Sequence, residues 1–306
     1  MKILVTTPTG RIGRQIVREL IAPEFSVRVI ARDPARLPDE IRDQVEVFSG
    51  STDDADMMCQ ALDDVEAMFF CVPPASQQET NVLGHYERFA QVAARAIRDA
   101  ETPRVVTISA LGKGRARNAG PISALHAMED LLDESGAAIR HLRCGLFMEN
   151  LLPQVPAIIE DGIISFPLPG HVAIPLVATA DIADLALRWL VRRDWSGVAG
   201  LAVHGPDDIS CNQVAASIER VLERPVRYQE AAANAFVRSL ISGGASREFA
   251  QGLVAMFTGL DRGIARAEPR TPVTTTSTTL ATWVRRELLP RIGPGVDDPS
   301  TIVCCA

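Results

Sequence analysis

Lysine is almost absent from this chain, since only Lys2 and Lys113 are lysine among its 31 Lys and Arg residues. Lys113 is therefore the one interior candidate for a catalytic lysine. Acidic residues outnumber basic ones, and the formal net charge is -7. A nucleic-acid-binding surface needs an excess of positive charge, so nucleic acid is not expected as a partner.

Regular cysteine spacing is also missing. The six cysteines form no C-x-x-C pair and the five histidines form no H-E-x-x-H motif, so neither a disulfide framework nor a metal site is predicted. No apolar run approaches the roughly 18 residues of a membrane span, and no secretory signal is expected at the start of the chain. These absences predict a cytoplasmic protein without a membrane partner.

Short apolar runs alternate with segments of helical periodicity, which predicts an α/β protein with a doubly wound parallel sheet, the Rossmann fold. Residues 1–150 are expected to form the NAD(P)-binding core, with the strands and helices of 172–204 returning to it. Residues 151–292 are expected to form mainly a smaller, mixed α/β substrate lobe, and residues 293–306 a disordered tail. Strands are expected at 3–5, 25–31, 45–48, 67–72, 105–109 and 138–143, a helix opening at Thr179 as its N-cap, and a last helix at 274–289.

The stretch from residue 2 to 20 resembles an anion site. An apolar strand leads into a turn, and a helix follows with apolar residues at helical spacing. The free N–H groups of a helix N-terminus attract a pyrophosphate, and glycines let it approach the backbone. The spacing is Thr7-x-x-Gly10-x-x-Gly13. Because a β-branched residue at positive φ costs roughly 1–2 kcal/mol, Thr7 must have a negative φ or be strained.

Arg32 follows the second expected strand, where a Rossmann unit meets the adenosine ribose. An acidic residue there binds the 2′-hydroxyl of NAD, whereas an arginine favours the 2′-phosphate of NADP. Asp33 is the competing candidate, and a solvated arginine is the structural alternative. The fully apolar run before Pro73 fits a central strand whose carboxyl end lies over the cofactor.

The order and spacing of several short motifs resemble the NmrA-like atypical short-chain dehydrogenases/reductases. The motifs are Thr9-Gly10-Arg11-Ile12-Gly13, Arg32-Asp33-Pro34, Val72-Pro73-Pro74, His126-Ala127-Met128-Glu129, Phe147-Met148-Glu149-Asn150 and Asp181-Ile182-Ala183. This resemblance implies a Rossmann core that binds NADP(H) and a small-molecule substrate under a C-terminal lobe, in a monomer or homodimer. The cofactor contacts would be Thr7, Thr9, Gly10, Arg11, Ile12, Gly13, Arg32, Cys71, Val72 and Pro73.

The usual reductase of this superfamily uses a Tyr-x-x-x-Lys dyad, which this chain lacks: Ala90 stands four residues after Tyr86, and Ala232 four after Tyr228. Four other groups are candidates to supply or relay a proton, each with a structural role as the alternative. They are Ser109 at a strand end, Lys113 in the glycine-rich loop, His126 at a position where the family keeps a histidine, and Tyr86 on its helix. Water is a further possible source.

The resemblance places Phe147, Met148 and Asn150 at the substrate side of the nicotinamide, with Tyr86 as a further substrate contact. For each, simple packing is the alternative. Two functions fit the sequence. One is an NADPH-dependent reductase of a ketone, quinone or enone on a small, fairly apolar molecule. The other is a non-catalytic NADP(H) sensor, which the missing dyad supports.

Overall fold

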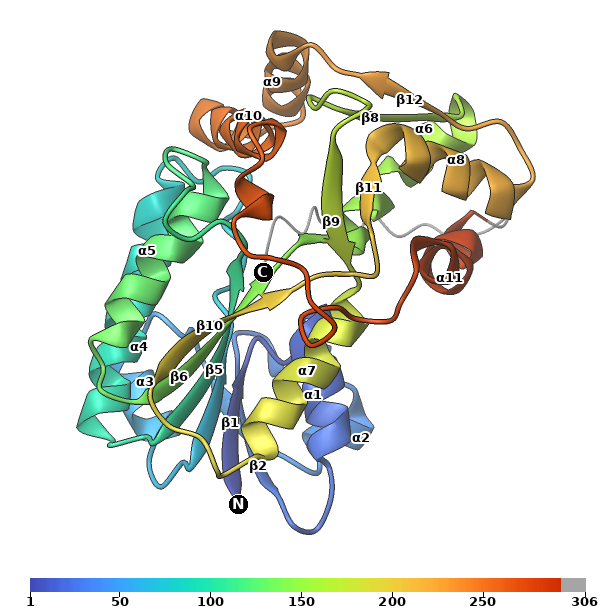
Figure 1. Cartoon of the computed structure of the whole chain (residues 1–306). Helices are drawn as coiled ribbons and strands as arrows, with labels where there is room; N and C mark the ends of the chain where they lie inside the picture. The colour runs from blue at the N-terminus through green and yellow to red at the C-terminus, as the bar shows by residue number, and fades with distance from the viewer. Residues whose placement is uncertain (293–306) are drawn as a thin grey trace.

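A seven-stranded parallel sheet forms the centre of the molecule (Figure 1), and the computed structural model describes residues 1–292. Every pair of neighbouring strands in this sheet runs parallel. The predicted doubly wound Rossmann sheet is therefore confirmed. From one edge to the other the strands are β10 (Val198–Val203), β6 (Ala138–Cys144), β5 (Arg104–Ala110), β4 (Ala67–Phe70), β1 (Lys2–Thr6), β2 (Ser26–Ala31) and β3 (Glu46–Ser49).

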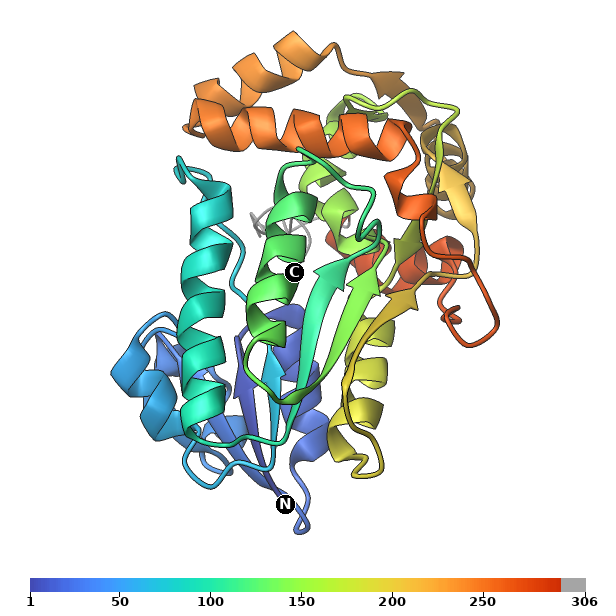
Figure 2. The same cartoon turned by 60° about the vertical axis from the view of Figure 1, so that its left-hand side comes forward.

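Helices cover both faces of this sheet, as Figures 1 and 2 show. The sequence of β4 is apolar throughout because successive side chains point to opposite faces of the sheet and both faces are buried. Met68 and Phe70 pack in one hydrophobic cluster, whereas Ala67 and Phe69 pack in the other. The first cluster includes α3 (Ala55–Ala61), α4 (Val82–Asp99) and α5 (Pro121–Asp133), and the second α1 (Arg11–Leu20), α2 (Asp39–Arg42) and α7 (Thr179–Val191).

The strand order reverses between β1 and β4. The chain runs from β1 through β2 to β3 at one edge, then returns to β4 and continues through β5 and β6 towards the other. In open α/β sheets, ligands bind at such a switch point, outside the carboxyl ends of the strands. The Thr6 hydroxyl joins these two ends, since it accepts a hydrogen bond from the Cys71 backbone N–H at 2.8 Å.

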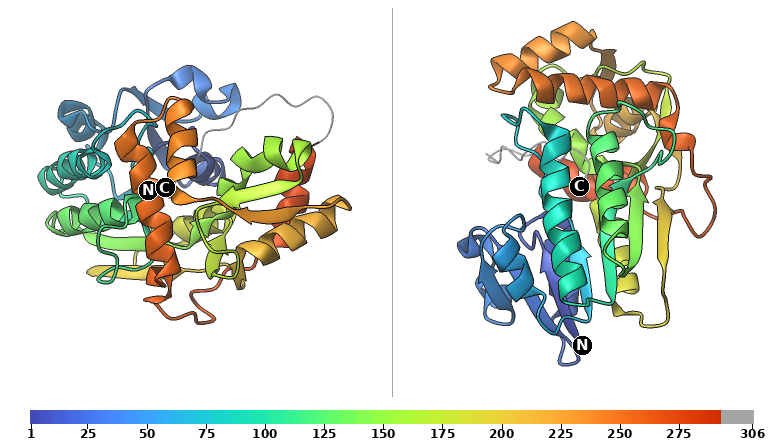
Figure 3. Two further views of the ribbon diagram at one scale, coloured as in Figure 1. Left: turned by 90° about the horizontal axis from the view of Figure 1, so that it is seen from above. Right: turned by 90° about the vertical axis from the view of Figure 1, so that its left-hand side faces the viewer.

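A smaller set of elements lies beyond the carboxyl ends of the main strands (Figures 1 and 3). It contains two short sheets and most of the remaining helices. The sheets are β11 (Asp208–Ser210)–β9 (Ala173–Val177)–β7 (Leu146–Phe147) and β12 (Arg227–Glu230)–β8 (Ile163–Phe166). The helices are η2 (Met148–Gln154), α6 (Val155–Glu160), α8 (Cys211–Leu222), α9 (Ala233–Ser242), α10 (Arg247–Asp261) and α11 (Leu280–Trp283).

The chain returns to the core after entering this lobe, because β10 pairs with β6 and α7 packs against α1. The division at residue 150 stays a prediction, and the tail predicted at 293–306 lies outside the described residues. Within residues 1–292, no helix has the length and apolar character needed to span a bilayer. The same residues contain no cluster of His, Cys, Asp and Glu side chains suited to a metal ion.

Candidate functional site

The turn after β1 is closed by a hydrogen bond from the Gly10 N–H to the Thr7 carbonyl at 3.0 Å. Thr7 takes a φ of 50°, so the strained alternative considered for this residue is the one observed. Gly10 then serves as the N-cap of α1 without a capping side chain. The first N–H groups of α1 consequently face the switch point, where an anion would accept their hydrogen bonds.

Gly13 lets α1 lie directly against this turn. A Cβ atom at this position would meet the Thr7 carbonyl oxygen at 2.3 Å and its carbonyl carbon at 2.9 Å. At Gly10 the corresponding Cβ would lie 3.2 Å from the same oxygen. The close packing of α1 against the turn therefore requires a glycine at position 13. The turn and the first N–H groups of α1 together form a cradle, and a side chain at position 13 would fill it.

The segment after β4 forms the other wall of the crevice. Cys71 and Val72 are buried, and the Pro73 carbonyl is 2.8 Å from Nε2 of His85 in the first turn of α4. Burial raises the pKa of the Cys71 thiol to about 11, so the thiol is neutral at physiological pH. Cys71 thus has the character of a packing residue beside the crevice, and its thiolate is not available for nucleophilic chemistry.

Arg32 is exposed at the carboxyl end of β2, beside β1. Its strand neighbour Arg28 is committed elsewhere, because its guanidinium donates to the carbonyls of Gln60, Ala61 and Asp63 at the end of α3. Of these two arginines, Arg32, which directly follows β2, is therefore the one whose side chain reaches solvent near the cradle. Its contact with a 2′-phosphate stays a prediction.

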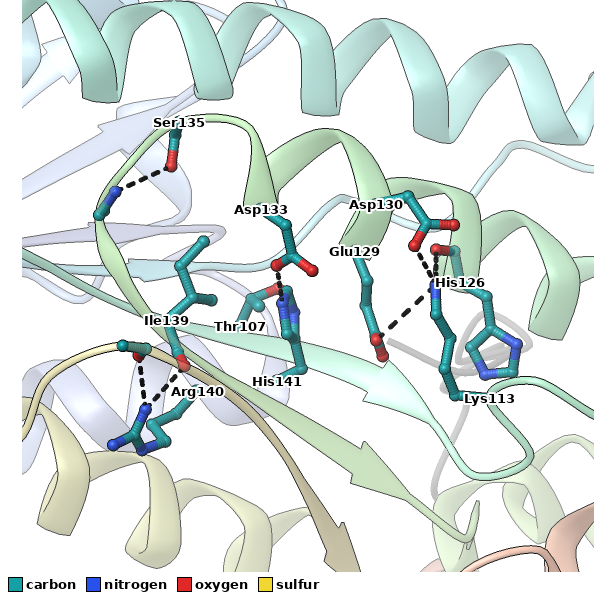
Figure 4. Close-up of polar contacts among 12 residues, drawn as sticks. Thr107, Lys113, His126, Glu129, Asp130, Asp133, Ser135, Ile139, Arg140 and His141 are labelled. Carbon is teal, nitrogen blue, oxygen red and sulfur yellow. Dashed lines mark hydrogen bonds and ion pairs between the residues drawn. The ribbon is translucent and has the colours of Figure 1, made fainter.

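Two of the candidate proton donors, Lys113 in the loop after β5 and His126 on α5, lie close together (Figure 4). The Lys113 ammonium donates to the His126 carbonyl and to Asp130, both at 2.6 Å. His126 Nε2 is 2.8 Å from the Ala110 carbonyl, and burial lowers the pKa of this histidine. A neutral ring that donates through Nε2 holds no second proton. These contacts fasten the loop to α5 and favour the structural alternatives for Lys113 and His126.

Ser109 is 1% exposed and lies near the buried carboxylate of Glu129 on α5, and within residues 1–292 its hydroxyl has no hydrogen-bond partner. Burial alone would raise the pKa of Glu129. The hydrogen bonds from Arg143 and the nearby positive charges outweigh burial and lower it. Arg143 forms a two-pronged pair with Glu129, with distances of 2.6 and 3.0 Å. The serine thus points into the helix layer, so this geometry also favours packing over catalysis.

This charged network extends into the lobe and was not anticipated from the sequence. Arg143 lies 3.7 Å from Glu268, whose other oxygen accepts the Gly112 N–H at 2.8 Å. Gly200 on the neighbouring strand makes room for Arg143, because a Cβ there would meet its guanidinium carbon at 2.2 Å. The partners lie far apart along the chain, and no local pattern marks them.

The four candidate substrate residues separate into two pairs. Tyr86, Phe147 and Met148 are all buried, 1%, 1% and 0% exposed, which favours packing, but only Phe147 of these three also lines a cavity of the described chain. Phe147 and Asn150 line one cavity of about 20 Å³, whose other walls are almost entirely apolar side chains from the lobe. Within the described chain, the Asn150 amide oxygen is buried without a hydrogen-bond partner. This buried amide oxygen distinguishes the cavity, because the rest of its wall is almost entirely apolar.

Glu149 is a second residue whose role the sequence did not reveal. Its carboxylate accepts from the Thr179 N–H and hydroxyl and from the Trp283 indole at 3.0 Å. The prediction that Thr179 is the N-cap of α7 is wrong: the cap is Ala178, and Glu149 supplies the acceptor from outside the helix. Burial raises the pKa of Glu149, and these hydrogen bonds oppose that effect.

The lobe touches the segment after β4 through the N-cap of α10. The Ser246 N–H donates to the Gln77 carbonyl at 2.7 Å, and its hydroxyl to the Glu79 carbonyl at 2.6 Å. This contact connects the turn between α9 and α10 to the wall of the crevice. The lobe is therefore attached to one wall of the crevice, the segment after β4.

A profile of the NmrA-like family matches residues 1–270. The chain belongs to the NmrA-like family. The resemblance predicted from the motifs is thus confirmed.

Two curated relatives and one solved structure illustrate this kinship. A (4-alkanoyl-5-oxo-2,5-dihydrofuran-3-yl)methyl phosphate reductase from Streptomyces griseus is 30% identical over 242 residues, covering 78% of this chain and 80% of the relative. An NAD(P)H azoreductase from Xenophilus azovorans is 29% identical over 230 residues, covering 74% and 76%. The NADPH complex of a quinone oxidoreductase from Escherichia coli superposes with a TM-score of 0.78 at 23% identity, covering 92% and 98%.

Proposed function

We propose that this protein is an NADPH-dependent reductase that transfers hydride to a ketone, quinone or enone of a small, fairly apolar molecule. Support comes first from the relatives, which are named as reductases of small molecules. It comes second from the position of the cradle at the switch point of the sheet. The surroundings of Asn150 and of the candidate proton donors then decide which substrate and which proton source are favoured.

The cradle suits a dinucleotide pyrophosphate. The absence of a Cβ at Gly13 lets the turn approach α1, and the N–H groups of Arg11 and Ile12 at the helix start would hold the phosphate oxygens. Arg32 would pair with the 2′-phosphate, which favours NADPH over NADH. The structural neighbour from Escherichia coli is described as NADPH-dependent and was solved with NADPH.

The observation that carries the substrate proposal is the Asn150 amide oxygen, which within residues 1–292 is buried without a hydrogen-bond partner in a wall that is otherwise apolar. Rotation of the Asn150 amide about its Cβ–Cγ bond brings the NH2 group into the inward position. It would then donate to the carbonyl oxygen of the substrate, while Phe147 and the neighbouring side chains contact its rings. Because the cavity holds only about 20 Å³, these side chains must move apart to admit a ring system.

The reaction requires a hydride and a proton. NADPH, when bound, supplies the hydride to the carbonyl carbon and becomes NADP⁺, and the electron pair of the C=O bond moves to oxygen. Asn150 would stabilise the charge that develops there. Lys113 and His126 are held in structural contacts and Ser109 is buried away from solvent, so we assign the proton to water. Quinones suit this scheme, since they accept hydride without an acid group of the enzyme.

The test is NADPH oxidation by the purified protein with a panel of quinones, azo compounds and polycyclic ketones. We expect turnover with at least one quinone, and Asn150→Ala should lower kcat/KM by about tenfold to a hundredfold, as the loss of one hydrogen bond to a developing charge does. Asn212→Ala, on the exposed start of α8, is the matched control. Clear NADPH binding with no turnover on any acceptor would refute the proposal.

A non-catalytic NADP(H) sensor is the second candidate. The observation that favours it is the engagement of Lys113 and His126 in contacts that leave neither as a free acid. A sensor would bind NADPH and NADP⁺ with different affinities and would show no oxidation above the rate without protein. The same panel assay separates the two functions, because only a reductase consumes NADPH in proportion to enzyme concentration.

A further inference from the structure

A polar groove of about 320 Å³ runs along the outer side of α1, opposite the strand β1. Its walls come from α1, from the start of α7 and from the segment after α11. Arg11, Arg14 and Arg18 are spaced i, i+3 and i+7, which places them on one face of α1. Arg286, in the π-helical turn Val284–Leu288, lines the groove from the other side.

The groove is distinct from the dinucleotide cradle. With a rise of 1.5 Å per residue, Arg14 and Arg18 lie about 4 and 10 Å down the axis from Arg11, away from the N-terminus of α1. The predicted adenosine contact, Arg32, lies in the other direction, at the end of β2. Arg11 takes part in both sites: its backbone N–H faces the cradle, and its side chain lines the groove.

The acidic groups around the groove are largely committed to other partners. Glu149 is buried and holds Thr179 and Trp283, while Glu287 pairs with Arg291 at 3.3 Å. Glu19, at the far end, is exposed. In the part of the chain that the structure describes, Arg14, Arg18 and Arg286 form no ion pair within 4.0 Å.

The neighbouring acids Asp181 and Asp184 are likewise engaged. Asp181 accepts the Thr278 N–H at 3.0 Å and its hydroxyl at 2.6 Å, and Asp184 accepts from Gln15 at 2.8 Å. Burial lowers the pKa of Arg11. Glu149 and Glu287 oppose this shift, while Arg291 and Arg14 reinforce it. The groove thus gathers the guanidinium groups of Arg11, Arg14, Arg18 and Arg286, and within residues 1–292 none of them forms an ion pair within 4.0 Å.

We infer that this groove is a second ligand site, one that binds a small phosphate-bearing anion. Guanidinium groups pair with phosphate oxygens through two parallel hydrogen bonds, and here they converge from two walls. The volume corresponds to about ten water molecules, which accommodates a phosphate group with an organic remainder of a few heavy atoms. Trp283 and Ala180 supply the apolar contacts for that remainder.

Inorganic pyrophosphate is a suitable first probe, titrated calorimetrically at low ionic strength. Because pyrophosphate would also enter an empty cradle, the titration is done with and without saturating NADPH. NADPH binding is measured first and independently, so a failure to bind the cofactor is recognised as such. We expect pyrophosphate to bind the NADPH-saturated protein, with an affinity that falls as salt rises.

Arg14→Ala and Arg18→Ala should each weaken pyrophosphate binding by about five- to tenfold, and the double variant should abolish it. Arg18→Ala should leave NADPH affinity within about twofold of wild type. Arg220→Ala, an exposed arginine near the end of α8, is the matched control and should bind as wild type does. Both substituted side chains in α1 are exposed, so far-UV circular dichroism should show native folding.

Three results would overturn the inference. One is the absence of measurable pyrophosphate binding to the wild-type protein in either condition. Another is binding that disappears when NADPH saturates the cradle. The third is equal weakening in Arg18→Ala and Arg220→Ala, which would show a general charge effect instead of a site.

Discussion

Replacing Gly13 by alanine tests the geometry of the cradle. The added Cβ would lie 2.3 Å from the Thr7 carbonyl oxygen and 3.1 Å from that of Thr6. To restore an ordinary contact, α1 must withdraw from the turn by about 1 Å. Overpacking of this kind costs roughly 1–3 kcal/mol of stability, so the protein should remain folded.

The loss of cofactor binding should be larger than the loss of stability. A shift of about 1 Å weakens the hydrogen bonds from the first N–H groups of α1 to the pyrophosphate. Losing two such bonds, at about 1.5 kcal/mol each, corresponds to about a hundredfold in the dissociation constant for NADPH. Fluorescence titration with NADPH measures this constant, and circular dichroism verifies the fold.

Gly252→Ala is the matched control, because it is also a glycine within a helix and its Cβ would meet no atom within 4 Å. We expect unchanged NADPH affinity and a gain of up to about 1 kcal/mol in stability from helix propensity. If Gly13→Ala were folded and bound NADPH as tightly as wild type, the turn would not be the pyrophosphate site.

The other predictions concern single side chains. Arg32→Ala should reduce the preference for NADPH over NADH by at least tenfold in paired titrations, and an unchanged ratio would remove Arg32 from the 2′-phosphate site. Lys113→Met should keep turnover within about threefold and cost about 1 kcal/mol or less in urea unfolding, since its ion pair is partly exposed; a hundredfold loss of turnover would make Lys113 catalytic instead. His126 is buried with a folded pKa below its ordinary value of 6.5, so the unfolded state takes up the proton first and stability should fall as pH drops below about 6.5. His126→Gln should show a smaller fall over the same range, and an identical profile would contradict the assignment. Iodoacetamide at pH 8 should alkylate exposed Cys59 in the native protein and spare Cys71, whose thiol is buried and neutral; equal peptide labelling by mass spectrometry would contradict the burial.

Local patterns were sufficient to predict the core of the fold. The apolar run of β4 and the helical spacing of α1 are set by neighbours within a few residues, and alternation of such segments leaves few topologies. The same rules predict a cofactor site at the carboxyl ends of the strands, and that site stays a prediction. The positive φ of Thr7 is one of the two regions that sterics leave open to this residue in the turn.

The roles of the polar residues could not be predicted in the same way. Ser109 and Lys113 face partners on α5, and Glu149 reaches Trp283 across 134 positions of sequence. Such pairings depend on how whole elements pack, and periodicity does not encode them. The last predicted helix is similarly altered: only Leu280–Trp283 is α-helical, and a π-helical turn follows it.

The most direct test of the account is NADPH oxidation with a panel of quinones, measured for wild type, Gly13→Ala and Gly252→Ala at a fixed NADPH concentration near its dissociation constant. The account predicts turnover with at least one quinone, a loss of most of that turnover in Gly13→Ala, and wild-type rates in Gly252→Ala. NADPH binding without oxidation by any acceptor, or full turnover in Gly13→Ala, would contradict it.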